Sequence, residues 1–459
     1  MTTRRTIGAA ELARGPIIEH IRRIAVPSAT AMALQTLFNI TNSFWAGTWS
    51  TEALAALAVS FPVFFVVVIA ASFGFSQGGA ALLAHALGKG DIETAVRLWA
   101  HALSLAALGG AGIAVASNAL APSVVELLGA TARVRELALE YLRPLLATTP
   151  LFLLTAAVNA ALTATGDTKS LRNAMFVATV ANVVLVPSFM YGLGPLPSLG
   201  VAGIASAHLL VQLGQLVWLA RRAGRTAPGR GLVRALGMPD VLLARRVLAQ
   251  VVPNTLTLAA TGAGLAIVTG FAGRHGAAAV AAYGVALRIE QLVLLPTLGL
   301  NAAIVALVGQ NLGAGETARV RAAVVTSLSV GVGLMSLGGI VVFVFRSPLL
   351  ALFTDDPEVV SLGALYLAIA VSGFPAYGVV VLAAGALQGL RKPLLALWVG
   401  IGRHLLVPPL FLWLFDHGLG LGFRGVALAV VLTSWIAAVT SGLLVSANLP
   451  RAVAQAAAR

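Results

Sequence analysis

Long apolar runs recur along the whole 459-residue chain, separated by short stretches that contain Gly, Pro and charged residues. A helix needs about 20 predominantly apolar residues to cross the hydrocarbon core of a bilayer. Twelve runs are long enough, so the pattern predicts an all-α integral membrane protein with twelve transmembrane helices. The predicted spans lie near residues 19–46, 51–84, 93–120, 136–163, 172–194, 200–222, 247–273, 278–311, 319–345, 357–388, 393–415 and 423–447.

The composition agrees with this class and narrows the chemistry. Hydrophobic residues make up 59% of the chain and charged residues only 10%, which lies far outside the range of soluble globular domains. There is no cysteine, so disulfides and thiolate metal sites are excluded, and the seven histidines are scattered without an HExxH pattern. No acids or histidines cluster near an interface. We therefore expect no metal, no cofactor and no enzymatic activity.

The formal net charge of +14 would suit a nucleic-acid-binding protein, but the distribution of the basic residues argues against that function. If both termini lie on one side, that side holds 22 of the 30 Lys and Arg residues, and the opposite loops hold six. This asymmetry is the positive-inside pattern and predicts cytoplasmic termini. Because Arg dominates over Lys and Ala and Gly are abundant, we expect a bacterial cytoplasmic (inner) membrane protein and no nucleic-acid partner.

The segments outside the spans divide the chain further. A cleavable signal peptide is not expected at the basic N-terminus, because it leads into a full span without a short apolar region and cleavage site. Residues 1–18 are predicted to be a cytoplasmic amphipathic segment, and Glu11 to Arg23 an interfacial helix. Residues 223–246 form a predicted basic cytoplasmic linker whose arginines contact lipid headgroups. Residues 448–459 are predicted to be a cytoplasmic tail.

An internal repeat organises the spans. Aligning "AVPSATAMALQTLFNITNSFWAG" with "VVPNTLTLAATGAGLAIVTGFAG" pairs Pro27 with Pro253 and Gly47 with Gly273 at a constant offset of 226. "ALGKGDIETA" likewise matches "NLGAGETA", and "GVAGIASA" matches "GFRGVALA". The repeat predicts two pseudo-symmetric six-helix lobes, residues 19–222 and 247–447, with a central cleft. Two parallel repeats around a cleft are typical of a secondary transporter that works by alternating access.

Only three ionisable residues lie clearly in the middle of spans, namely Arg288, Glu290 and Arg403. A charge at the bilayer centre costs several kcal/mol, so such residues are functional candidates. Glu290 lies near the midplane, and helical periodicity places it on one face with Tyr283 and the polar residues Thr297 and Asn301. We therefore predict that this face lines a cavity, where a carboxylate could hold a proton or Na⁺ and exchange it for a cationic substrate.

A structural role for Glu290 is the alternative. Arg288 is two positions away and points almost in the opposite direction on a straight helix, although Pro296 bends the helix nearby. Glu290 could therefore form a fixed ion pair with Arg403, or with Arg288 across the bend, and only hold the second lobe together. The sequence leaves both roles open.

The run "GVALRIEQLVLLPTLGLNAAIVALVGQNLGAG" (284–315), with the "ALGKGDIETA" and "GQNLGAGETA" segments, resembles the MATE (multidrug and toxic compound extrusion) transporters of the MOP flippase superfamily. The resemblance covers nearly the whole chain and is greatest to the DinF-like branch, whose arginine-isoleucine-glutamate motif falls on Arg288, Ile289 and Glu290. It implies export of cationic, amphipathic organic compounds in exchange for H⁺ or Na⁺, through a cleft between two lobes.

Departures from the family pattern shift the expected coupling to the second lobe. Asn42 stands where many prokaryotic members carry an aspartate, Val186 precedes Pro187 where a second aspartate is common, and Thr261 stands near a family glutamate. None of these residues can take up a proton, so Glu290, with Arg288 beside it, is the expected ion-coupling residue. The residues expected to line the substrate cavity are Tyr283, Thr297, Asn301, Asn42, Asn182, Gln35, Thr261 and Arg403.

Other functions fit the sequence less well. A flippase for lipid-linked precursors shares the two-lobe plan but needs several basic residues in the cleft, and only Arg288 and Arg403 lie mid-span. A transporter of the major facilitator type predicts G-x-x-x-D-[RK] after the second span, which "LGKGDIETAVR" does not supply. We therefore expect a monomeric, cation-coupled exporter whose partners are a small organic cation and the lipid bilayer.

Overall fold

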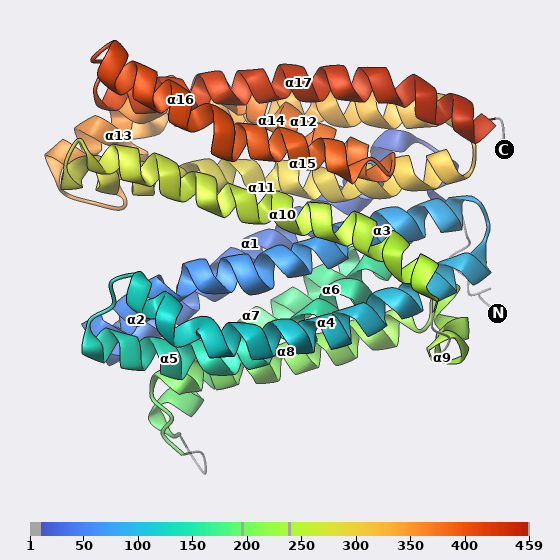
Figure 1. The fold of residues 1–459 in the computed structure, drawn as a ribbon, viewed down its shortest axis with the longest axis horizontal. Helices are drawn as coiled ribbons and strands as arrows, with labels where there is room; N and C mark the ends of the chain where they lie inside the picture. The colour runs from blue at the N-terminus through green and yellow to red at the C-terminus, as the bar shows by residue number, and fades with distance from the viewer. Residues whose placement is uncertain (1–10, 194–196, 237–239, 458–459) are drawn as a thin grey trace. The chain divides into compact units, whose positions relative to one another are not determined.

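The computed structural model describes residues 11–193, 197–236 and 240–457, and every regular element in these ranges is a helix (Figure 1). Within them, ten helices are long and apolar enough to cross a membrane, or eleven if a pair bent by 46°, Ala132–Ala147 and Thr149–Ala164, counts as one span. The bent pair coincides with the predicted fourth span. The all-α membrane fold is confirmed.

The predicted first span is the helix α1 (Ile17–Trp49), which has 33 residues but is not among those ten. Its apolar run is interrupted by Gln35, Asn39 and Asn42. The prediction of one interfacial helix from Glu11 to Arg23 is wrong. A short 3-10 helix, η1 (Glu11–Ala13), ends before Gly15, which has a φ of 77°. Pro16 lies directly before α1. Proline is tolerated at the start of a helix, but in a helix interior it lacks the N–H needed for a hydrogen bond, so η1 and α1 are separate helices.

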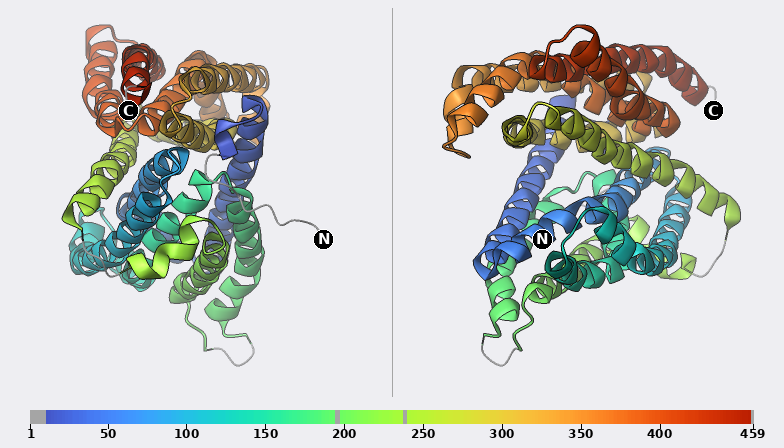
Figure 2. Two further views of the ribbon diagram at one scale, coloured as in Figure 1. Left: turned by 90° about the vertical axis from the view of Figure 1, so that its right-hand side faces the viewer. Right: turned by 60° about the vertical axis from the view of Figure 1, so that its left-hand side comes forward.

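Contacts divide the described chain into two compact units. The first contains Thr30–Thr255, together with the described residues before Gly15. Its helices α7 and α8 (green) pack side by side along their length (Figures 1 and 2). Beside part of α1, its elements are α2 (Thr51–Phe64), the π-helical turn η2 (Phe65–Ile69), α3 (Ala70–Gly88), α4 (Ile92–Leu127), α5 (Ala132–Ala147), α6 (Thr149–Ala164), α7 (Lys169–Tyr191), α8 (Val201–Ala223), η3 (Pro228–Gly231) and α9 (Leu232–Ala235).

The second unit contains Gly15–Ala29 and Leu256–Arg459 in so far as these residues are described. The helix α10 (Val241–Gly273) contributes to both units, as α1 does. The other elements of the second unit are α11 (Ala277–Gly313), α12 (Thr317–Ala351), α13 (Pro357–Ala370), η4 (Val371–Gly373), α14 (Phe374–Gly389), α15 (Pro393–Ile401), the π-helical turn η5 (Gly402–Leu406), α16 (Val407–Trp413), the π-helical turn η6 (Leu414–Gly418) and α17 (Phe423–Ala457).

Close helix packing in each unit depends on glycine. In the first unit, a Cβ atom on Gly78 of α3 would lie 2.8 Å from the Gln250 carbonyl oxygen of α10. In the second unit, a Cβ atom on Gly299 of α11 would collide with the Ala25 carbonyl oxygen of α1. Membrane helices approach this closely only where small residues face each other. Each unit is therefore held together partly by backbone-to-backbone contact.

The segments predicted to lie outside the spans are largely helical where they are described. Residues 1–10 of the predicted N-terminal segment, residues 237–239 of the predicted linker and residues 458–459 of the predicted tail lie outside the described residues. Within the linker, η3 and α9 pack on the start of α4, where Val96 and Ala100 contact Ala235. The tail is continuous with α17 as far as Ala457.

Candidate functional site

Glu290 lies on α11 in the second unit, beside two tyrosines. Tyr283, two turns earlier on the same face, packs edge-to-face on Tyr366 of α13 with ring centroids 5.4 Å apart. Both rings are buried, and Phe423 of α17 closes the other side of Tyr366 at 6.1 Å. This arrangement follows from the seven-residue spacing of Tyr283 and Glu290, which returns a helix to nearly the same face. The carboxyl group is thus close to phenolic hydroxyls inside an otherwise apolar core.

The carboxyl group of Glu290 is half-buried and forms no ion pair within 4.0 Å in the described chain. It interacts electrostatically with Arg403 and with the hydroxyl of Tyr366. That hydroxyl is itself buried and has no hydrogen-bond partner among the described residues. Buried polar groups without partners are uncommon and call for an explanation.

Arg403 is held by groups other than Glu290. Its guanidinium stacks on the ring of Tyr377 of α14, with Cζ 3.9 Å from the centroid, and its Nη2 donates to the hydroxyl of Ser434 of α17 at 3.4 Å. Arg288 is exposed on the opposite side of α11 from Tyr283. In the described chain, neither arginine forms an ion pair with Glu290 within 4.0 Å. The structure therefore contains neither the ion pair of Glu290 with Arg403 nor the ion pair of Glu290 with Arg288.

The π-helical turn η5 positions Arg403 and His404. Such turns insert an extra residue into a helix and are frequent at functional sites. His404 lies against α10, where its Nε2 and the hydroxyl of Thr261 are 3.2 Å apart. Gly264 of α10 allows His404 to approach this closely, because a Cβ atom on residue 264 would lie only 2.8 Å from Cβ of His404. Thr261, predicted to line a cavity, thus meets the residue next to Arg403.

Thr297 and Asn301 continue the face of Glu290 along α11, and both are buried. Their side-chain oxygens Oγ1 and Oδ1 have no hydrogen-bond partner among the described residues. The Asn301 oxygen lies against Gly385 of α14, in the space that a larger residue there would fill. These two residues are therefore enclosed between α11 and its neighbours rather than exposed.

The candidates of the first unit form a separate group. The side-chain nitrogen of Asn182 on α7 donates to Oδ1 of Asn42 on α1 at 2.8 Å, and both residues are buried. The hydroxyl of Thr179 also reaches α1, at the Leu34 carbonyl oxygen 3.2 Å away. The two amides thus join α1 to α7. Gln35 has an exposed side chain one residue from this contact.

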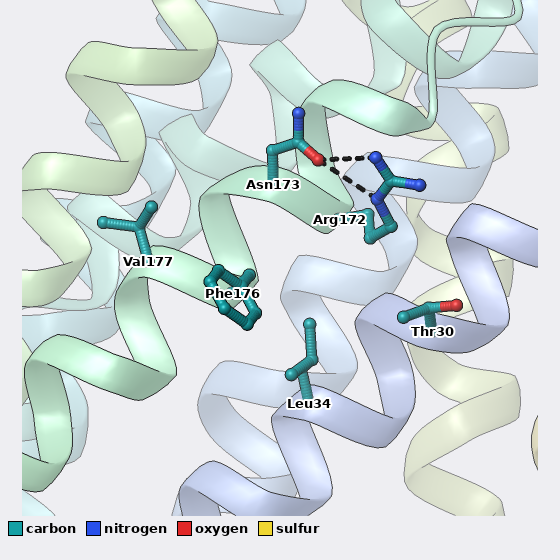
Figure 3. Close-up of a pocket in the computed structure, with 6 residues that line it drawn as sticks. All are labelled: Thr30, Leu34, Arg172, Asn173, Phe176 and Val177. Carbon is teal, nitrogen blue, oxygen red and sulfur yellow. Dashed lines mark hydrogen bonds between the residues drawn. The ribbon is translucent and has the colours of Figure 1, made fainter.

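A groove in the first unit lies beside the same two helices (Figure 3). Arg172 donates from Nε and Nη2 to Oδ1 of its neighbour Asn173, at 3.1 and 2.7 Å. The groove holds none of the mid-span ionisable residues. Its lining residues are Thr30, Leu34, Arg172, Asn173, Phe176 and Val177.

Sequence reasoning missed three residues that surround the mid-span charges, namely Tyr366, Tyr377 and Ser434. Each is a polar group inside an apolar run, which is the only signal that could have identified them. No group of three or more His, Cys, Asp or Glu side chains in the described part of the chain is arranged to hold a metal ion.

Long apolar helices in two compact units, one of which carries ionisable residues in the middle of its helices, define a multi-pass membrane protein. The MatE family profile matches residues 27–188 and 253–413, one segment in each repeat. The chain therefore belongs to the MATE family, whose members are transporters rather than enzymes, and the suspected resemblance is confirmed at this level.

Individual relatives agree with this assignment. A Shewanella oneidensis protein named FAD transporter is 28% identical over 403 residues, which cover 86% of this chain and 87% of the relative. A Thermotoga maritima protein named probable multidrug resistance protein NorM is 25% identical over 353 residues, or 76% of this chain and 75% of the relative. A MATE crystal structure in a bent conformation superposes with a TM-score of 0.90 at 25% identity, covering 98% of this chain and 99% of the other.

Proposed function

We propose that this protein is a secondary antiporter of the bacterial cytoplasmic membrane, with both termini in the cytoplasm. It exports an organic, cationic and amphipathic compound in exchange for H⁺ or Na⁺, and Glu290 is the coupling residue. Family membership supports the transport activity. The observation that carries the coupling role is the state of Glu290, a half-buried mid-helix carboxyl group without an ion pair in the described chain.

The surroundings of Glu290 suit exchange better than a fixed structural role. A carboxylate that is permanently paired with a guanidinium would have no site free for a second cation. Here Arg403 is engaged by the ring of Tyr377 and the hydroxyl of Ser434. The carboxyl group can therefore bind a proton or Na⁺ in one step and give it up when a cationic substrate approaches. The hydroxyl of Tyr366 interacts with this carboxyl group and would donate to the carboxylate when no cation is bound.

The test is transport by purified protein in proteoliposomes. Glu290→Gln removes the ionisable group but keeps its size, so we expect substrate-driven H⁺ or Na⁺ flux to be lost while folding is retained. Glu358→Gln, at the exposed start of α13, is the matched control and should transport normally. Replacing Na⁺ at fixed pH identifies the coupling ion. Full coupling in Glu290→Gln, or a variant that no longer folds, would contradict the proposal.

A second candidate function, export of an anionic aromatic compound, is favoured by one observation. The guanidinium of Arg403 already stacks on an aromatic ring, and Arg288 is exposed on a membrane-spanning helix. Arginine pairs with phosphate and stacks on flat rings. The Shewanella relative is named for such a compound, FAD. Competition between FAD and an organic cation for transport, in the parent protein and in Arg403→Gln, distinguishes the two candidates.

A further inference from the structure

The first part of α4 is hydrogen-bonded to Asp240, the residue that precedes α10, in the first unit. The backbone N–H of Asp240 donates to Nε2 of His101 at 2.9 Å, and Nδ1 of His101 lies 2.7 Å from the Arg97 carbonyl oxygen. Arg97 in turn donates from Nη2 to Oδ2 of Asp240 at 2.8 Å. Three contacts between 2.7 and 2.9 Å therefore close a ring through Arg97, His101 and Asp240.

The ring fixes the protonation state of His101. A backbone N–H can only donate, so Nε2 of His101 must be the acceptor and carry no hydrogen. Its other nitrogen then carries the hydrogen and donates it to the Arg97 carbonyl oxygen. His101 is only 8% exposed, so water has little access to replace either bond. The contact as it stands can be made only by neutral histidine.

Protonation of His101 would break this contact. A hydrogen on Nε2 would face the N–H of Asp240, so that two donors would point at each other in a buried position. The carboxylate of Asp240 is already engaged on both oxygens, because Oδ2 is bound by Arg97 and Oδ1 accepts from the N–H groups of Leu242 and Leu243 at 2.9 and 3.1 Å. A protonated Nε2 can no longer accept from the backbone N–H of Asp240, so the ring must turn away from that N–H group.

Other ionisable groups near this end of α4 do not compete for His101. His85 and Lys89 belong to the end of α3, and Arg230 and Arg234 to η3 and α9, which pack on α4. None of them is hydrogen-bonded to His101 in the described chain. Hydrogen bonds from the backbone of Leu243, then from Leu242, and the nearby Arg97 and His101 hold the pKa of Asp240 below its usual range. The carboxylate form of Asp240 is thus favoured in the folded protein.

The second repeat provides an internal comparison. At the offset of 223 that pairs Ala95 with Ala318, Arg97 corresponds to Val320 and His101 to Val324, both of which are buried and apolar. Only the first repeat is followed by the linker that leads to α10. The polar ring therefore occurs in the repeat whose helix α4 contacts the end of the linker. If these positions served only helix packing, valine would be sufficient, as in the second repeat.

We propose that His101 is a proton-receiving site on the cytoplasmic side that holds the start of α10 on α4 while neutral and releases it when protonated. The proton comes from the cytoplasmic water and binds Nε2 as the Asp240 hydrogen bond opens. Its meaning for the transport cycle rests on the proposed function, because a cytoplasmic proton would then loosen α10, a helix shared by both units. The release itself requires no transport activity.

The absence of cysteine allows a direct test by spin labelling. Glu93→Cys on α4 and Leu242→Cys on α10 are both exposed and flank the ring. In nanodiscs, the distance between the labels should be short and narrowly distributed at about pH 8, and longer and broader at about pH 5, the range over which histidine titrates. In His101→Gln, which keeps an acceptor but cannot be protonated, the distribution at both pH values should match that of the parent at high pH. His275→Gln, in the second unit, should respond as the parent does.

An unchanged distance in the parent, or a persistent pH response in His101→Gln, would overturn the proposal. If His101→Gln does not fold, hydrogen exchange of the unlabelled parent protein provides an independent test. Protection of the amide of Asp240 and the first turn of α10, corrected for intrinsic exchange rates, should fall up to about tenfold in acid, the effect of one buried hydrogen bond. Equal protection at both pH values would count against the site. We expect the spin labels to show the same pH response in Glu290→Gln as in the parent. Glu290→Gln should lose transport but keep the release of α10, which separates this proposal from the proposed ion coupling.

Discussion

Arg403 stacks on Tyr377 with its guanidinium carbon 3.9 Å from the ring centroid, instead of forming an ion pair with Glu290. A mid-span arginine beside a carboxylate would be expected to close that pair, because an isolated charge is costly in a low-dielectric interior. The tyrosine ring and Ser434 provide alternative partners for the cation. We therefore expect Tyr377 to influence how far Glu290 is available to other cations.

Substitution of Tyr377 tests this relationship. Tyr377→Leu removes the ring and should let Arg403 move onto Glu290, which lowers exchange activity; Tyr377→Phe retains the ring and should stay close to the parent. A stacked cation contributes about 0.5–2 kcal/mol, so the activity ratio between the two variants should be up to about thirtyfold. The measurement is initial exchange rate in proteoliposomes at equal protein density. Equal rates in both variants would show that the stack does not control Glu290.

The amide pair of Asn42 and Asn182 should stabilise the first unit without coupling ions. Asn182→Ala leaves an unpaired buried oxygen on Asn42, which costs about 1–3 kcal/mol, whereas the double substitution removes both partners and should cost less than the sum. Thermal unfolding in detergent of both single variants and the double variant measures this coupling energy. Ion-coupled flux should persist in Asn42→Ala, with weaker substrate binding at most, and its loss would move the coupling site to the first unit.

Two adjacent glycines of α4 differ in what surrounds them. A Cβ atom on Gly110 would lie 2.7 Å from Cα of Pro150 at the start of α6, while nothing lies within 4 Å of a Cβ atom on Gly109. Gly110→Ala should destabilise the protein by about 1–3 kcal/mol through overpacking. Gly109→Ala should be neutral or stabilising by up to about 1 kcal/mol, because alanine favours helix. Thermal unfolding compares them, and equal effects would contradict the packing of α4 on α6.

Asp91 caps α4 and should make stability depend on acid. The side-chain and backbone hydrogen bonds of Thr94, the latter 2.9 Å long, hold the pKa of Asp91 below its usual value. A lowered folded-state pKa means that the stabilisation is complete above the unfolded value and is lost as pH falls through the folded value. Asp91→Ala should therefore cost about 1 kcal/mol near neutral pH and progressively less below about pH 4. Unfolding temperatures of both proteins across that range provide the measurement, and a constant difference would exclude the charged cap.

The sequence predicted the helices and one face of the site, but not the partners of its residues. The predicted eighth span, 278–311, is α11 with bounds Ala277–Gly313, because a long apolar run between glycines has few other solutions in a membrane. The spacing of Tyr283 and Glu290 likewise placed both on one face. Tyr366, Tyr377 and Ser434 could not be foreseen, because they depend on which faces of α13, α14 and α17 pack together.

Long-range polar contacts were equally invisible to periodicity. His101 and Asp240 are separated by 139 positions in the sequence. The sequence analysis predicted that the arginines of the linker contact lipid, and it did not predict that the linker packs on α4. Hydrophobic patterns indicate which residues are buried, but a single histidine on an apolar helix does not show which distant residue it will contact. The break at Gly15 and Pro16 was missed because an amphipathic pattern continues through it.

The π-helical turns are distributed unequally between the repeats. The second repeat has η5 in its fifth span, while the matching helix α7 of the first repeat is α-helical throughout, and the first repeat has η2 where α11 of the second is continuous. An additional residue in a turn rotates everything beyond it by roughly 100°. Each such turn shifts the register of its helix by one residue, so the pseudo-symmetry of the two repeats is broken locally, at η2, η5 and η6.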